Sequence, residues 1–437
     1  MSDRTFQPET LAIHAGQIPD RETGARALPI YQTTSFVFDS ADHAADLFNL
    51  ATFGNVYSRL SNPTVAALEE RVAALEGGRA AVASASGMAA EAMALMTLLQ
   101  QGDHVVAAGA LYGGTVTMLA VSLAKFGITT TFVDATKPEA FAAAMQPNTR
   151  AVFAESLGNP SLAVLDIAAV ADVAHAHGVP LVIDNTVPSP FLCNPIALGA
   201  DIVVHSATKY LAGHGTTLGG VIVESGRFPW DNGKFPGMTE PSAGYHGVKF
   251  YETFGDFGFS MRARMETLRV YGSTLSPMSA WQILQGVETL PLRMERHCSN
   301  ALAVAQHLRR HPRVGWVNYP GLDDHPQHAL VQRQMRSIAS LGGRPGASGL
   351  LSFGVQGGMA AGVKFIESAQ FMSHLANIGD TRTLMIHPAS TTHRQLSDEQ
   401  QLAAGVPPDM VRLSVGLEHI DDILWDIDQA LAASAGA

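Results

Sequence analysis

From residue 61 onward, the apolar and polar positions of the 437-residue chain switch repeatedly between a strand-like and a helix-like spacing. Short apolar runs typical of buried strands lie at 79–84, 104–108, 128–133, 150–155, 180–184, 201–205 and 218–223. Between several of them, apolar residues recur at helical spacing until a glycine ends the pattern, as over 166–178. This alternation predicts an α/β fold with a mostly parallel seven-stranded sheet and helices on both faces.

The first helix of this region has clear boundaries in the sequence. Asn62 supplies a capping side chain, and Pro63 suits the first helical position. Apolar residues then follow at helical spacing up to Gly77, where we expect the helix to end.

The remaining regions follow different patterns. Residues 1–60 have no long periodic run, so we expect an arm with a helix near 40–50 that packs on a neighbouring subunit. We take 61–272 as the large domain and 273–437 as a smaller α+β C-terminal domain. The stretch 225–260 breaks the alternation and is typical of an aromatic loop. In the C-terminal region we expect a helix over 273–311 broken near Pro291, a strand at 349–355, a helix at 358–368, a strand at 411–415 and a helix from 419.

Composition narrows the class of protein. The net charge of −11 argues against a nucleic-acid partner, which requires a basic surface. Cys193 and Cys298 are the two cysteines, and they form no disulfide framework. Residues 1–5 lack a leader pattern, and no apolar stretch is long enough to cross a bilayer. We therefore expect a cytoplasmic protein without a membrane partner.

Two apolar strands end in residues that suit pyridoxal phosphate. One ends at Asp184, and the other leads into Ser206, Thr208 and Lys209. A lysine amine forms a Schiff base with the cofactor aldehyde, and an aspartate keeps the pyridine nitrogen protonated. Both lie where parallel sheets bind ligands, at the carboxyl ends of the strands.

Three further segments offer partners for such a cofactor. Ser86, Gly87 and Met88 come between a strand and a helix, where free amides and the helix dipole favour a phosphate. Tyr112 follows another strand and could stack on the pyridine ring. Arg59, beside Tyr57 in the arm, offers a permanently charged donor for phosphate. The 17 histidines show no paired spacing for a metal, and there is no phosphate-binding P-loop motif.

Ordered motifs along nearly the whole chain resemble the Cys/Met-metabolism enzymes that use pyridoxal phosphate, a branch of the aspartate-aminotransferase fold (fold type I). They are 10–16, 29–36, Tyr57-Ser58-Arg59, Asn62-Pro63-Thr64, Ser86-Gly87-Met88, Glu155-Ser156, Asn159-Pro160, Asp184-Asn185-Thr186, 206–210 and 411–418. The resemblance implies a homotetramer, a dimer of dimers whose active sites are shared between two chains.

The resemblance also implies residue roles. Lys209, Asp184 and Tyr112 are the catalytic residues, with Lys209 as the Schiff-base lysine. The residues implied to contact the substrate are Arg412, Asn377 and Tyr57, and Arg412 is implied to hold the substrate α-carboxylate. The residues implied to contact the cofactor are Tyr57, Arg59, Ser86, Gly87, Met88, Tyr112, Asn159, Asp184, Thr186, Ser206, Thr208 and Lys209.

Within the family, the segments 385–393, 245–247 and 418–420 resemble the O-acetylhomoserine sulfhydrylase branch. This implies γ-replacement, in which O-acetyl-L-homoserine and sulfide or methanethiol give homocysteine or methionine and acetate, in methionine biosynthesis. Methionine γ-lyases are also similar but usually carry cysteine where Gly114 stands, and many relatives have serine in place of Asn377. The alternatives are methionine γ-lyase, a cystathionine γ-synthase or lyase, and, in another class, a non-catalytic α/β binding protein. The choice of acetyl or succinyl ester, and of sulfide or methanethiol, stays open.

Overall fold

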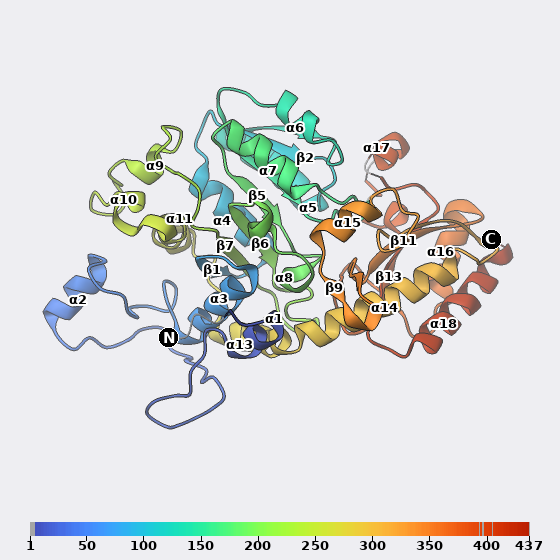
Figure 1. Ribbon diagram of the computed structural model, residues 1–437, viewed down its shortest axis with the longest axis horizontal. Coiled ribbons are helices and arrows are strands. Elements are labelled where there is room, and N and C mark those ends of the chain that lie inside the picture. Colours follow the sequence, from blue (N-terminus) through green and yellow to red (C-terminus); the bar gives the residue numbers. More distant parts are fainter. Residues whose placement is uncertain (1–4, 393, 396, 404, 437) are drawn as a thin grey trace.

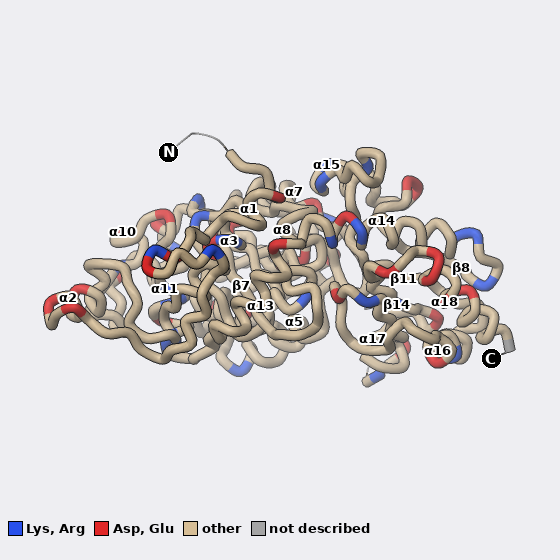
Figure 2. The backbone as a smooth tube through the Cα atoms, turned by 90° about the horizontal axis from the view of Figure 1, so that it is seen from below, with Lys and Arg blue, Asp and Glu red and all other residues tan. Residues whose placement is uncertain are grey.

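The computed structural model describes residues 5–392, 394–395, 397–403 and 405–436. Residues 1–4 and His393, which belong to segments considered above, lie outside these ranges. Figure 1 shows a large sheet surrounded by helices, an N-terminal segment on one side and a second sheet with its own helices on the other. Acidic and basic residues are interspersed along the chain (Figure 2).

The large sheet has seven strands in the order β1-β7-β6-β5-β4-β2-β3. They are β1 (Ala80–Ser84), β2 (His104–Ala108), β3 (Thr129–Val133), β4 (Thr149–Glu155), β5 (Leu181–Asp184), β6 (Ile202–Ser206) and β7 (Gly220–Glu224). All pairings are parallel except those of β7 with β1 and with β6. The predicted α/β fold with a mostly parallel seven-stranded sheet is confirmed.

Helices connect these strands, and local sequence explains where they begin and end. In α3 (Pro63–Glu76), the Asn62 side chain accepts a hydrogen bond from the Thr64 amide at 3.0 Å, and Gly77 ends the helix with a φ of 69°. The other helices up to β7 are α4 (Gly87–Leu98), α5 (Gly113–Thr117), α6 (Pro138–Ala143), α7 (Ile167–Ala176) and α8 (Ser189–Leu192).

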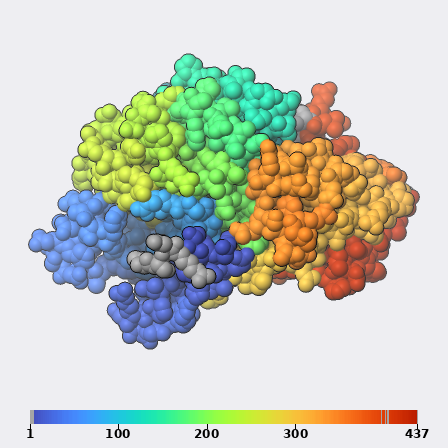
Figure 3. Space-filling view, viewed as in Figure 1, coloured from blue at the N-terminus to red at the C-terminus, as the bar shows by residue number. Residues whose placement is uncertain are grey.

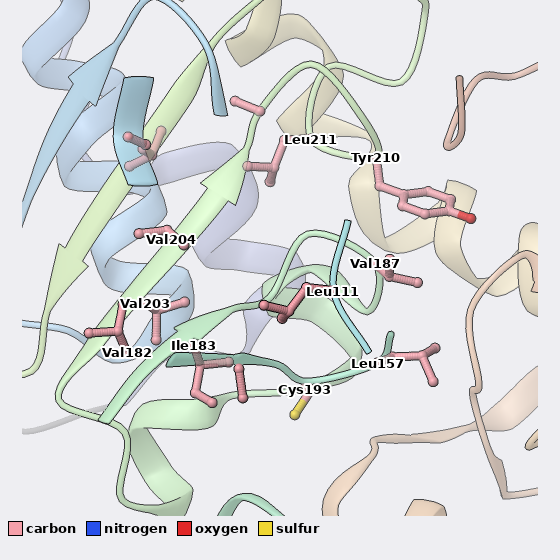
Figure 4. Close-up of a cluster of buried hydrophobic side chains, with 14 of the residues drawn as sticks. Leu111, Leu157, Val182, Ile183, Val187, Cys193, Val203, Val204, Tyr210 and Leu211 are labelled. Carbon is pink, nitrogen blue, oxygen red and sulfur yellow. The ribbon is translucent and has the colours of Figure 1, made fainter. Parts of the chain in front are cut away.

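The central strands are apolar on both faces, because helices cover both sides. Figure 4 shows Val182 and Ile183 of β5 beside Val203 and Val204 of β6, and each is at most 1% exposed. This rigid core fixes the strand ends, where the polar residues lie.

The stretch 225–260 is not the continuous loop that its composition suggested. It contains α9 (Pro236–Thr239), α10 (Phe250–Phe254) and the start of α11 (Gly258–Arg262). Trp230 stacks on Phe259 with ring centroids 5.6 Å apart, and it also contacts Phe228 and Phe235. The aromatic residues thus form a local core that orders these short helices.

The C-terminal region contains a five-stranded sheet in the order β12-β13-β14-β11-β8. The expected helix over 273–311 is two helices, α13 (Pro277–Glu288) and α14 (Leu290–Leu308), which meet at Thr289, close to the expected break. The strands are β8 (Val314–Asn318), β11 (Leu350–Val355), β12 (Ser373–His374), β13 (Leu384–Ile386) and β14 (Met410–Ser414). The other elements after α11 are α12 (Arg269–Tyr271), α15 (His328–Gln334), β9 (Ser337–Ile338), β10 (Arg344–Pro345), α16 (Gly358–Ser368), α17 (Asp398–Ala403) and α18 (Ile420–Ala433).

Between residues 5 and 60, extended segments and turns join two helices, α1 (Pro8–His14) and α2 (Ala41–Phe48). The helix expected near 40–50 is present, whereas α1 was not expected. The part around α2 projects away from the large sheet (Figures 1 and 3). Within the described ranges, no helix has the length and apolar character needed to cross a membrane.

Candidate active site

A cavity lies where the carboxyl ends of β4, β5 and β6 face the second sheet. Strands of a parallel sheet commonly present their ligand-binding residues at this edge. The lining residues are Ser86, Gly87, Met88, Glu91, Tyr112, Glu155, Leu157, Asn159, Asp184, Thr186, Val187, Ser206, Thr208, Lys209, Leu218, Ala376, Asn377, Ile378 and Arg412. The cavity therefore collects most of the residues that the sequence pointed to.

Lys209 follows β6 by three positions and reaches into this cavity. Its Nζ donates a hydrogen bond to Oδ1 of Asn377 at 2.5 Å. Burial lowers the pKa of Lys209 to about 8, and the positive charge of Arg412 acts in the same direction, against the opposing charge of Asp184. A lysine with a lowered pKa supplies a neutral, nucleophilic amine more readily.

Asp184 is the last residue of β5 and lines the same cavity. Its Oδ1 accepts a hydrogen bond from the Thr186 amide at 2.8 Å. Burial raises the pKa of Asp184, whereas the bonds from Thr186 and the nearby His205 lower it. The Thr186 hydroxyl in turn accepts from the Ser206 amide at 2.8 Å, which ties the ends of β5 and β6 together.

The start of α4 forms a second polar corner of the cavity. The Ser86 hydroxyl caps the helix by accepting from the Ala89 amide at 3.2 Å. A Cβ at Gly87 would lie 2.6 Å from Cβ of Ser206, so only glycine lets the helix start come this close to β6. Free amides at the start of a helix, beside the hydroxyl-bearing Ser206 and Thr208, form a suitable cradle for an oxyanion.

Tyr112 precedes α5, and its side chain is 52% exposed at the cavity. Its backbone amide donates to Oε1 of Glu155 at 2.5 Å. The other carboxyl oxygen of Glu155 accepts from the Asn159 amide at 3.2 Å. Glu155, whose pKa is raised well above its usual value by burial and by the charge of Asp184, thus anchors two lining loops.

Arg412 of β14 enters the cavity from the second sheet. One terminal nitrogen donates to Oδ1 of Asn159 at 3.0 Å, and the other donates to the Asn377 carbonyl at 3.0 Å. Its Nε is buried and has no hydrogen-bond partner among the described residues. A held guanidinium with a free buried donor is suited to an anionic group.

Tyr57 and Arg59 do not line this cavity. They lie on the N-terminal arm, where the Arg59 guanidinium sits 5.4 Å from the centroid of the Tyr57 ring, and the Tyr57 side chain is 41% exposed. Ser35, another residue of the arm, pairs with Tyr57 in an isolated antiparallel β-bridge.

Two acidic residues that line the cavity, Glu91 and Glu155, were assigned no role from the sequence, although the position of each in the sequence is distinctive. Glu91 is the only charged residue within α4, which is otherwise apolar or small. Glu155 ends a buried strand, as Asp184 does. Among the described residues, no group of three or more acidic, histidine or cysteine side chains is placed to hold a metal.

Residues 9–432 match the Cys/Met metabolism PLP-dependent enzyme family. The chain belongs to this family. Relatives include an O-acetyl-L-homoserine sulfhydrylase of Leptospira meyeri, 54% identical over 98% of this chain and 97% of the relative. Another, O-acetyl-L-homoserine sulfhydrylase 1 of Thermus thermophilus, is 50% identical over 97% and 99%. The homocysteine synthase of Schizosaccharomyces pombe is 50% identical over 97% of both chains.

The crystal structure of a Campylobacter jejuni protein described as an O-acetylhomoserine (thiol)-lyase by assignment superposes with a TM-score of 0.93 at 40% identity, covering 98% of this chain and 100% of the other. That protein carries a pyridoxyl-lysine monophosphate. The cavity of the present family member fits this group. It holds a lysine amine, a half-buried acid at a strand end, an oxyanion cradle that excludes a Cβ at Gly87, and an arginine with a free donor.

Proposed function

We propose that this PLP-dependent family member is an O-acetylhomoserine sulfhydrylase. It would convert O-acetyl-L-homoserine and sulfide to homocysteine and acetate, with methanethiol giving methionine, and so serve methionine biosynthesis. The chain is 54% and 50% identical to two O-acetyl-L-homoserine sulfhydrylases over nearly its full length. This similarity carries the proposal, together with the cavity that brings Lys209, Asp184 and Arg412 into one site.

A feature beside Tyr112 favours a sulfhydrylase over a methionine γ-lyase. A Cβ at Gly114 would lie 2.6 Å from Cε1 of Tyr112 and 3.1 Å from Sδ of Met88. The cysteine that is usual in the γ-lyases therefore does not fit here without moving the tyrosine ring.

Each residue has a task in this proposal. When bound, pyridoxal phosphate supplies an electron-accepting ring that makes Cα of an amino acid acidic. Lys209 attaches the cofactor, and once its amine is free it takes the proton from Cα and moves a second proton from Cβ. Asp184 holds the proton on the pyridine nitrogen, and Tyr112 stacks on the ring face.

The other residues bind and orient. Ser206, Thr208 and the amides of Gly87 and Met88, with Ser86 as the helix cap, form the phosphate cradle. Thr186 fixes Asp184, whose Oδ1 accepts from its amide. Arg412 binds the substrate α-carboxylate through its free Nε, while Asn159 and Asn377 hold the guanidinium from two sides.

The arm extends the proposal to the assembly. We assign Tyr57 and Arg59 to the cofactor phosphate of a neighbouring subunit, and Tyr57 also to its substrate, because both residues lie outside the cavity of their own chain. This arrangement needs at least a dimer, and a dimer of dimers is the expected homotetramer. We divide the chain into an arm (1–60), a cofactor-binding domain (61–272) and a C-terminal domain (273–437), and we assign the protein to the cytoplasm.

The deciding experiment follows absorbance and products in one cuvette. A visible band that changes on adding O-acetyl-L-homoserine, with homocysteine formed only when sulfide is present, supports the sulfhydrylase. Release of 2-oxobutanoate without sulfide would indicate a lyase instead. Absence of a band after adding pyridoxal phosphate would indicate a non-catalytic binding protein. The Lys209→Ala variant is the control and should lack the band formed by covalent attachment.

A further inference from the structure

Three acidic side chains meet at the inner wall of the cavity, although the proposed reaction uses only one. Glu91 of α4 is 4% exposed and Glu155 at the end of β4 is 7% exposed, and both line the cavity with Asp184. Buried carboxyl groups this close together do not all stay charged, because each negative charge disfavours the next.

Glu91 makes two side-chain hydrogen bonds. Its Oε2 accepts from the Thr115 hydroxyl at 2.7 Å. A hydrogen bond with the carboxyl group of Asp184 is one of the causes that raise the pKa of Glu91 and lower that of Asp184. Ionised carboxylates only accept hydrogen bonds, so a bond between two carboxyl groups requires one proton between them.

The surroundings decide which of the two carries the proton. Asp184 accepts a hydrogen bond from the backbone amide of Thr186 and lies near His205, and both neighbours favour the ionised form of Asp184. Glu91 has the Thr115 hydroxyl as its other partner, and burial together with the charge of Asp184 raises its pKa well above the usual value.

We propose that Glu91 is a positioning residue that stays protonated at neutral pH and donates its proton in a hydrogen bond to the Asp184 carboxylate. The bond fixes the orientation of the anion that faces the pyridine nitrogen. Because Glu91 also accepts a hydrogen bond from Thr115, it links Asp184 to α5, the helix that begins directly after Tyr112. This inference rests on the assignment of Asp184 in the proposed function.

The other ionisable groups around the pair act on its charge in known directions. Glu155 on β4 has its own pKa raised well above the usual value, first by burial and then by the charges of Asp184 and Glu91. His205 on β6 and Lys209 after it favour the anion of Asp184. The arrangement therefore leaves one proton on the pair and places it on Glu91.

Infrared difference spectroscopy of the protein without cofactor tests the proton directly. Wild-type protein minus Glu91→Gln at neutral pH should show the C=O stretch of one neutral carboxylic acid. Glutamine keeps the shape, donates its amide to Asp184 and accepts from Thr115, so the fold should survive. A difference spectrum showing loss of a carboxylate instead would overturn the proposal. This readout needs neither cofactor nor turnover, so it is separate from a failure of the proposed function.

Thr115→Val gives a second, conservative test. Loss of the donor to Oε2 should move the same C=O stretch to higher frequency, because a hydrogen bond to the carbonyl oxygen lowers it. An unchanged frequency would mean that the neutral acid is not Glu91.

Affinity for pyridoxal phosphate tests the positioning role. Glu91→Leu keeps the size but removes the donor, and we expect affinity to fall about tenfold, as for loss of a hydrogen bond to a buried charged group. Glu91→Gln should stay within about threefold of wild type because its donor remains. Equal affinity of the leucine variant and wild type, measured by equilibrium dialysis, would reduce Glu91 to a packing residue.

Discussion

Lys209 and Asn377 stand 168 positions apart in the chain, yet Nζ of the lysine donates to Oδ1 of the amide at 2.5 Å. The same asparagine accepts a hydrogen bond from Arg412 through its backbone carbonyl. One residue between β12 and β13 thus holds both cationic groups of the cavity. Because they come from different sheets, Asn377 sets the distance between the proposed base and the proposed carboxylate site.

Asn377→Ala should release the lysine amine from this restraint. We expect kcat to fall about tenfold, the usual scale for a lost hydrogen bond to a charged group, while cofactor content stays the same. Asn377→Ser, the residue of many relatives, should recover part of the loss because its hydroxyl also accepts. Steady-state kinetics with sulfide checks this, and an unchanged kcat in the alanine variant would show that the contact does not orient Lys209.

Arg412→Lys should separate charge from geometry. Lysine keeps the positive charge but cannot hold Asn159 and the Asn377 carbonyl while donating to a substrate carboxylate. We expect kcat/KM for O-acetyl-L-homoserine to fall roughly a hundredfold, with most of the change in KM. The visible absorbance of the bound cofactor serves as the control and should be unchanged. If KM stays at the wild-type value, the carboxylate binds elsewhere.

Two neighbouring glycines give a matched test of Tyr112. A Cβ at Gly114 meets the tyrosine ring at 2.6 Å, whereas a Cβ at Gly113 meets no atom of the described residues within 4 Å. Gly114→Ala should therefore displace the ring and lower kcat/KM about tenfold, and Gly113→Ala should stay within about twofold, since stacking of this kind contributes ~1 kcal/mol. Equal kinetics of the two variants would mean that the ring position does not matter.

Local patterns were enough to predict the seven strands, the start of α3 and the strand-end positions of Asp184 and Lys209. Each of these depends on short-range periodicity, capping residues or the general rule for parallel sheets. The short helices in 225–260 were missed because their stability comes from a tertiary aromatic cluster rather than from periodicity.

Contacts across the fold could not be read from sequence spacing. Glu91 meets Asp184 only because α4 lies against the sheet, and Asn377 meets Lys209 only because the second sheet faces the first. Glu91 is the one charged residue in the otherwise apolar or small α4, but its spacing in the sequence indicates no partner for it. Long-range pairing of this kind depends on the packing of whole elements, which no local pattern contains.

The lowered pKa of Lys209 predicts how the stability of the cofactor-free protein depends on pH. In the folded protein this pKa is about 8, below the ordinary value of 10.5 expected in the unfolded chain. Between these values the unfolded chain binds a proton that the folded protein lacks, so the free energy of unfolding rises with pH. The full gain is ~3 kcal/mol, from about 1.4 kcal/mol for each pH unit. Below pH 8 both states are protonated, and the lysine contributes no slope.

Lys209→Met provides the reference for this effect, because methionine has an unbranched side chain of similar length but no charge. We expect the urea midpoint of the wild-type apoprotein, measured against that of the variant, to rise from pH 8 to pH 10 and to stay level from pH 6 to pH 7. Ionisable groups far from Lys209 titrate equally in both proteins and cancel in the difference. A difference that is flat across the whole range would mean that Lys209 keeps its ordinary pKa in the folded protein, and the neutral amine would then need the cofactor itself to form.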